Sequence, residues 1–262
     1  MSHPPAARLP AAAVLTAATL LTATACLAVT PEQAQDPLTV TSPGTERDGQ
    51  ASPTPGLTDA QVRAALINEA DLGAPWMPSE GAATWRDGLL KGTANAAPDC
   101  QRLLEGLYTE ELLGPPSGGQ AVTALDDGDD QAQLRYQVAV HRPADVDRTL
   151  AWLKTLPGTC GQFMATTTRA GVEAVQVEEL PLPALGDARQ GLRVTLTGEG
   201  GTDGEAAPVL TLDVAAVRAG DNAILLTIGA LDTVPPDDLA PRTLALGTGR
   251  LIQIREQSHT QA

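Results

Sequence analysis

Aromatic rings and imidazoles are scarce in this chain. Its 262 residues include only three Trp, two Tyr, one Phe and three His. So few rings leave little material for stacking nucleic-acid bases. Positive charge is also in short supply, because 17 Lys and Arg residues stand against 32 Asp and Glu residues, for a formal net charge of −15. That charge repels phosphate backbones and anionic headgroups, which argues against a nucleic-acid partner and against a polybasic membrane patch.

The residue combinations that catalysis and metal binding require are missing too. His141 is the only His in the region that we expect to fold, which leaves no His/Cys cluster for a metal and no Ser–His–acid set with a G-x-S-x-G elbow. The acidic run 126–130 lacks EF-hand spacing and fits a hairpin turn. The adjacent carboxylates Glu178 and Glu179 point different ways on a strand. We expect no enzyme activity, no metal and no cofactor.

The N-terminus is typical of an export signal. Residues 9–25 are apolar or small throughout, too short and too rich in Ala and Thr for a membrane span but suited to a signal peptide. The sequence Ala23-Thr24-Ala25-Cys26 resembles a bacterial lipobox, in which the Cys is acylated, for example with palmitate. We expect a lipoprotein signal peptide at 1–25 and a lipid anchor on Cys26, at the outer face of the cell membrane. The alternative is an ordinary secretory signal with A-x-A cleavage.

The remainder divides by composition. Residues 26–56 comprise the lipidated Cys and a segment rich in Pro, Thr, Ser, Gln and Gly without apolar periodicity, which is typical of a disordered linker. Residues 57–256 are long enough to bury a sizeable core without metals. Residues 257–262 form a polar tail that we expect to fray.

Apolar spacing within residues 57–256 predicts four helices and seven strands. The helices are expected at 58–72, 98–113, 143–156 (ended by Pro157-Gly158) and about 237–252 (interrupted by Gly247 and Gly249). The strands are expected at 119–127, 131–140, 162–168, 172–180, 190–198, 209–218 and 222–230. The last strand is apolar on both faces, as in the middle of a covered sheet. Mostly short turns predict an α+β fold, a mostly antiparallel sheet flanked by helices, with the helices on one face.

Two cysteines remain for the folded region once Cys26 is lipidated. Cys100 and Cys160 allow one connectivity in an exported domain. We expect a single domain with one disulfide, which links the start of the second helix to the end of the third.

Several segments in this order resemble the PknH-like extracellular sensor-domain family of actinobacteria, which occurs on receptor kinases and on free lipoproteins. The residues that support the resemblance are 65–76 (ALINEADLGAPW), 98–108 (PDCQRLLEGLY), 160–163 (CGQF), 182–194 (LPALGDARQGLRV) and 214–228 (VAAVRAGDNAILLTI). It spans about residues 57–255. The resemblance implies an antiparallel sheet flanked by helices around a cleft, an unassigned extracytoplasmic ligand and no catalytic residues. Members on kinases often have two disulfides, whereas this domain has cysteines for one.

Two function classes follow. The first is a membrane-anchored, ligand-binding or sensor-like lipoprotein whose ligand is a small molecule, a lipid or a cell-wall fragment. The second is a non-catalytic envelope scaffold or protein-interaction module. We expect a cleft beside the hairpin 120–140, where a dry cavity of several hundred Å3 lined by Leu and Val with a few Arg favours ligand binding, and a filled core with a flat apolar patch favours scaffolding. The ligand-binding residues stay open. The side chains that could line a pocket are Trp76, Trp85, Trp152, Arg135, Arg193 and Arg218.

Overall fold

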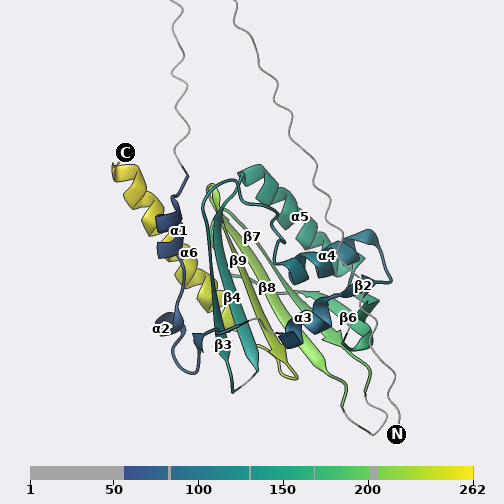
Figure 1. Ribbon diagram of the computed structural model, residues 1–262. Coiled ribbons are helices and arrows are strands. Elements are labelled where there is room, and N and C mark those ends of the chain that lie inside the picture. Colours follow the sequence, from purple (N-terminus) through teal and green to yellow (C-terminus); the bar gives the residue numbers. More distant parts are fainter. Residues whose placement is uncertain are drawn as a thin grey trace, which may run out of the picture. The chain divides into compact units, whose positions relative to one another are not determined.

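A nine-stranded antiparallel sheet forms the centre of the folded domain (Figure 1). The computed structural model describes residues 56–81, 84–129, 131–167, 169–200, 204 and 206–261. The strands are β1 (Met77–Pro78), β2 (Gly92–Ala94), β3 (Gln120–Asp127), β4 (Ala132–Val140), β5 (Gln162–Thr167), β6 (Gly171–Glu179), β7 (Ala188–Thr197), β8 (Val209–Ala219) and β9 (Asn222–Leu231). Their order is β1-β3-β4-β9-β8-β7-β6-β5-β2, and each neighbouring pair is antiparallel. The predicted antiparallel sheet is confirmed.

Short turns account for most of this order. β8 and β9 pair up to Ala219↔Asn222, so only Gly220 and Asp221 form the turn, and Gly220 has a φ of +63° that favours glycine. β5 to β9 follow one another as a meander. β4 then pairs with β9, which joins the β3–β4 hairpin to that meander. β8 and β9 therefore lie in the middle of the sheet, as the apolar sequence of residues 222–230 predicts.

Helices cover both faces of the sheet. They are α1 (Asp59–Ala64), α2 (Glu69–Leu72), α3 (Thr84–Leu90), α4 (Pro98–Thr109), α5 (Pro143–Thr159) and α6 (Leu239–Gln261). We call the face under α3, α4 and α5 the first face, and the face under α1 and α6 the second face (Figure 1). The expectation that all helices pack on one face is wrong. β9 shows why both faces need cover, because Leu225 enters the first core while Leu226 and Ile228 enter the second.

The first core contains the predicted apolar stripe of α5 and the predicted disulfide. Val146, Leu150 and Leu153 are all buried against the sheet, and each such side chain contributes about 1.5–3 kcal/mol on burial. Cys100 near the start of α4 is bonded to Cys160 at the end of α5, with Cα atoms 5.5 Å apart. The disulfide predicted from the cysteine count is confirmed.

Some predicted helix boundaries were wrong. The helix expected over 58–72 is two helices. The second begins after Asn68, whose side-chain Oδ1 accepts hydrogen bonds from the backbone N–H groups of Ala70 and Asp71. Pro157 does not end α5 but lies within its last turns, before the helix ends at Thr159. Between the first and second predicted helices, where no element was predicted, the chain forms α3 and the edge strands β1 and β2.

α6 is longer and more regular than predicted. It passes through Gly247 and Gly249 without interruption and extends beyond Ile252 to Gln261. Gly247 is required by packing rather than by backbone freedom, because a Cβ there would overlap the ring of Tyr136 on β4. The glycine thus allows α6 to lie close against the second face.

Candidate functional site

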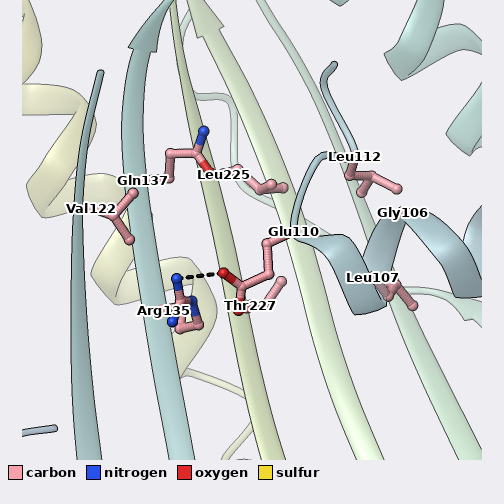
Figure 2. A pocket seen from close by; sticks show the side chains of 9 residues that line it. All are labelled: Gly106, Leu107, Glu110, Leu112, Val122, Arg135, Gln137, Leu225 and Thr227. Carbon is pink, nitrogen blue, oxygen red and sulfur yellow. Dashed lines mark ion pairs between the residues drawn. The ribbon is translucent and has the colours of Figure 1, made fainter. Parts of the chain in front are cut away.

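A groove on the first face lies beside the β3–β4 hairpin, at the position predicted for a cleft. The α4 helix and the segment after it form one wall, and β3, β4 and β9 form the other (Figure 2). The groove exists because α3, α4 and α5 leave the hairpin end of the first face open, with the side chain of Val122 42% exposed. We call it the hairpin groove. Its lining residues are Gly106, Leu107, Glu110, Leu112, Val122, Arg135, Gln137, Leu225 and Thr227.

The lining combines apolar walls with a few polar groups. Four aliphatic side chains, from Leu107, Leu112, Val122 and Leu225, face Glu110, Arg135, Gln137 and Thr227. In the sheet register, Arg135 lies opposite Thr227 and Gln137 opposite Leu225, so these side chains share the first face. The free volume is only about 20 Å3, which is room for one water molecule. The mixture of apolar and polar lining residues is the one expected for ligand binding, but the cavity is smaller than the expected several hundred Å3.

A carboxylate between two arginines spans the groove. Arg86 on α3 is 4% exposed and donates to Oε1 of Glu110 at 2.9 Å and to the carbonyl of Leu107 at 3.0 Å. Arg135 on β4 forms an ion pair with the other oxygen of Glu110 (Figure 2). The Nε of Arg86 is buried with no hydrogen-bond partner in the described part of the chain. Glu110 therefore connects a buried cation to a cation at the groove surface, where the Arg135 side chain is 30% exposed.

The position of Glu110 follows from how α4 ends. Glu110 is the C-cap of α4 and has left-handed backbone angles, φ 60° and ψ 22°, a conformation that costs a non-glycine residue about 1 kcal/mol. We call residues 110–114 the strap. Within the strap, the side chains of Leu112 and Leu113 are buried, and Gly114 has a φ of +74°. Its ion pairs and buried leucines hold the strap in this strained conformation.

The strap separates the hairpin groove from a larger hollow between α4 and α5. This α4–α5 hollow has a volume of about 360 Å3 and shares Gly106 and Leu112 with the groove. A Cβ on Gly106 would lie 2.9 Å from Cδ1 of Leu112, so the glycine lets the strap pack against α4. Arg102 stacks 3.8 Å above the ring of Trp152 in this hollow, and Trp152 donates to Asp99 at 3.0 Å. Of the strap residues, only Leu112 lines both the hairpin groove and the α4–α5 hollow.

A third hollow lies on the second face, over β5, β6 and β7, which α1 and α6 leave open. It has a volume of about 410 Å3. Uncharged residues line it throughout, namely Gln162, Phe163, Met164, Ala174, Val175, Gln176, Thr195 and Thr197. Met164 is 45% exposed. This surface is open and mixed in polarity.

The structure places two of the six candidate pocket residues in a hollow. Arg135 lines the hairpin groove and Trp152 lines the α4–α5 hollow. Trp76 is buried in the second core, and Trp85 packs against the first.

Two of the other candidates are structural cations. Arg193 is bound through two nitrogens to the buried Asp213, at 2.7 and 2.9 Å, and hydrogen bonds raise its pKa. Arg218 binds Asp147 and Asp187.

Sequence reasoning missed four of the polar groups at the groove. They are Arg86, Glu110, Gln137 and Thr227. A helical spacing of Trp85 and Leu89 could have revealed α3 and hence the inward position of Arg86. Nothing in the spacing of Arg86, Glu110 and Arg135 along the chain indicates that they meet.

Other chemistry-bearing residues lie apart. His141 is 3% exposed, and burial lowers its pKa. Within the described ranges, no three His, Cys, Asp or Glu side chains come together as metal ligands. Among these same residues, no helix is both long and apolar enough to cross a membrane. The predicted lipid anchor, Cys26, lies outside the described residues.

Comparisons with known proteins yield distant likenesses. The extracellular domain of PknH from Mycobacterium tuberculosis is 13% identical, with 78% of this chain and 100% of that chain covered and a TM-score of 0.40. A hypothetical protein from Helicobacter pylori is 19% identical over 37% of this chain and 57% of that chain, with a TM-score of 0.22. The Ran-binding protein Mog1p from Saccharomyces cerevisiae is 12% identical over 53% of this chain and 76% of that chain, with a TM-score of 0.21. No family model and no curated protein matches the chain. These likenesses are too distant to assign a function.

Proposed function

We propose that this protein is a membrane-anchored extracytoplasmic lipoprotein whose folded domain binds a small ligand in the hairpin groove, without catalysis. The observation on which this rests is the groove itself, in which four aliphatic side chains surround Arg135, Gln137 and Thr227. Ligand sites in proteins are typically apolar with a small number of polar groups that fix orientation. Because the free volume is about 20 Å3, a ligand enters by moving Leu112 and the strap aside.

The proposed location is supported by the N-terminal sequence and by the disulfide. A bond between Cys100 and Cys160 fits an oxidising compartment outside the cytoplasm. The segment up to Cys26 supplies an export signal and an acylation site. In this proposal, Cys26→Ala releases the chain from the membrane fraction into the soluble extracytoplasmic fraction, and an unchanged membrane fraction contradicts the anchor.

A second candidate function is an envelope scaffold or protein-interaction module. The open second face favours it, because Met164 and Val172 are exposed there by 45% and 39%. The two candidates place the working surface on opposite faces of the sheet, so substitutions can separate them.

The experiment is native mass spectrometry of the full chain, extracted from its own membrane in polymer-bounded discs without detergent. Val122→Asp places a charge in the groove at a strand position that is 42% exposed, and Val172→Asp makes the same change at a 39% exposed strand position on the other face. We expect a reproducible added mass on the wild type and on Val172→Asp, and none on Val122→Asp.

The opposite pattern identifies the second candidate. No added mass on any of the three chains, together with a specific protein partner that Val172→Asp loses and Val122→Asp keeps, overturns ligand binding in the groove. An added mass that both substitutions leave in place also rejects the groove as its site.

A further inference from the structure

The charges in the hairpin groove select a class of ligand. We infer that the groove takes a single-chain amphiphile with an anionic head, a carboxylate or a phosphate, which displaces Glu110 from Arg135. This inference rests on the proposed function and specifies the ligand of that same groove.

Arg135 is available to an incoming anion. Its side chain is 30% exposed and points across the groove toward Glu110 (Figure 2). Its ion pair with Glu110 is formed through Nη2, and a guanidinium has five N–H donors in a planar fork. That fork matches the two oxygens of a carboxylate or phosphate.

Glu110 can release Arg135 without leaving a buried charge unpaired. Its other oxygen remains 2.9 Å from the buried Arg86, which also keeps its hydrogen bond to the carbonyl of Leu107. The exchange therefore replaces the carboxylate of Glu110 by the anion of the ligand at Arg135 only, and the pair between Glu110 and Arg86 stays in place. The alternative, an unpaired buried arginine, would be strongly unfavourable.

Two unused polar side chains lie next to Arg135. Gln137 and Thr227 line the groove, and within the described residues neither side chain has an internal hydrogen-bond partner. An amide N–H2 and a hydroxyl can both donate to an anionic oxygen. Three donor groups from two paired strands therefore line the groove, with Thr227 directly opposite Arg135 in the sheet register.

The remaining wall is aliphatic. Leu107 and Leu112 from the α4 side face Val122 and Leu225 from the sheet. An alkyl chain along this wall covers Val122, which is otherwise 42% exposed to water. The formal net charge of −15 opposes the approach of an anion, but screening at physiological salt confines that repulsion to about 8 Å.

The test measures binding of four ten-carbon probes to the full chain by titration calorimetry, below their micelle concentrations. The probes are decanoate, decyl phosphate, 1-decanol and decyltrimethylammonium. We expect decanoate and decyl phosphate to bind at least about tenfold more tightly than decanol, because a bidentate contact with Arg135 is stronger than the pair with Glu110 that it replaces, and we expect the cationic probe to bind most weakly. The ratio between the two anions distinguishes a carboxylate site from a phosphate site.

Substitutions locate the effect. Arg135→Gln is expected to remove the preference for anions over decanol, and Arg135→Lys to retain part of it. Arg142→Gln is the matched control, since it makes the same change in the exposed pair with Asp145, outside the groove. Near-ultraviolet circular dichroism verifies that each variant is folded.

Other results would reject the anionic ligand, and they distinguish this from a failure of ligand binding in the groove itself. Equal binding of decanol and decanoate, both lost in Val122→Asp, rejects the anionic head and leaves ligand binding in the groove. A preference for anions that Arg135→Gln does not change also rejects it. If none of the probes binds while the native added mass persists, the ligand class is wrong and the proposed function stands. If the protein from its own membrane also carries no added mass, both the ligand class and the proposed function are wrong.

Discussion

Replacing Gly247 by Ala tests how closely α6 packs on β4. A Cβ at this position would lie 2.6 Å from Cζ of Tyr136 and closer still to its hydroxyl. Tyr136 has no exposed surface, so its ring has no free space to enter. Helix propensity alone predicts a gain of about 1 kcal/mol for Gly→Ala, whereas overpacking costs about 1–3 kcal/mol. Because ring atoms are involved, we take about 3 kcal/mol for the overlap and expect a net loss of about 2 kcal/mol in the free energy of unfolding.

The same helix offers a control of opposite sign. Gly249 is exposed, and a Cβ there meets no atom within 4 Å. Gly249→Ala should therefore stabilise the domain by about 1 kcal/mol, which raises Tm by about 2–4 °C for a domain of this size. Tyr136→Phe removes a buried hydroxyl that has no hydrogen-bond partner in the described structure, so on its own it should be neutral or stabilising.

The assay is urea unfolding followed by far-ultraviolet circular dichroism, with the disulfide intact. Gly247→Ala should cost less in a Tyr136→Phe background than in the wild type, because part of the overlap is with the hydroxyl. Equal stabilisation by Gly247→Ala and Gly249→Ala would refute the close contact between α6 and β4. An unchanged cost of Gly247→Ala after Tyr136→Phe would place the strain elsewhere.

Three further predictions concern groups away from the groove. The disulfide closes a loop with a sequence separation of 60, so Cys100→Ala/Cys160→Ala should cost about 4 kcal/mol, and a loss well under this in urea unfolding argues against the loop-entropy reasoning. Burial raises the pKa of Glu173 above its ordinary 4.5, so its contribution to stability is full below 4.5 and is lost as pH rises through the folded pKa. Glu173→Gln should flatten that part of the Tm-versus-pH curve, and parallel curves contradict this. Arg250 binds Asp71 at 2.7 and 3.0 Å and lowers its pKa, so stability from this pair is present above pH 3.8 and is lost as pH falls through the folded pKa. Asp71→Asn should cost about 1–2 kcal/mol near neutral pH and progressively less in acid, whereas a cost independent of pH rules out the ion pair as its source.

Strand positions were predictable because alternation is a local property. Leu134, Tyr136 and Val138 alternate with Arg135 and Gln137, and the two sets do lie on opposite faces of β4. Helix ends were less predictable. The capping box at Asn68 is a local pattern that was present in the sequence and overlooked, whereas the role of Gly247 depends on a ring that is distant in sequence.

The apolar pattern of β9 implies helices on both faces of the sheet. A strand that is apolar on both faces, as residues 222–230 are, needs packing partners on both. That requirement conflicts with helices on one face only. The position of the groove beside the hairpin and the place of Arg135 in it were predictable, but the contact of Arg135 with Glu110 and Arg86 was not, because these residues come from β4, the end of α4 and α3. Only the tertiary structure brings them together.

In the described part of the chain, each helix layer leaves part of its face of the sheet uncovered, and of the two uncovered regions described above only the hairpin groove offers charged groups to a ligand. The first layer of helices leaves the hairpin end open, and the second layer leaves β5, β6 and β7 open. The lining of the second-face hollow is uncharged, so it offers nothing to fix the orientation of an ion. The hairpin groove adjoins the strap, where the buried Arg86 holds Glu110 at the surface beside Arg135. Because Glu110 stays bonded to Arg86 when it releases Arg135, Arg135 is the charge that a ligand can engage, and this is the physical reason to place selective binding at the groove rather than over β5, β6 and β7.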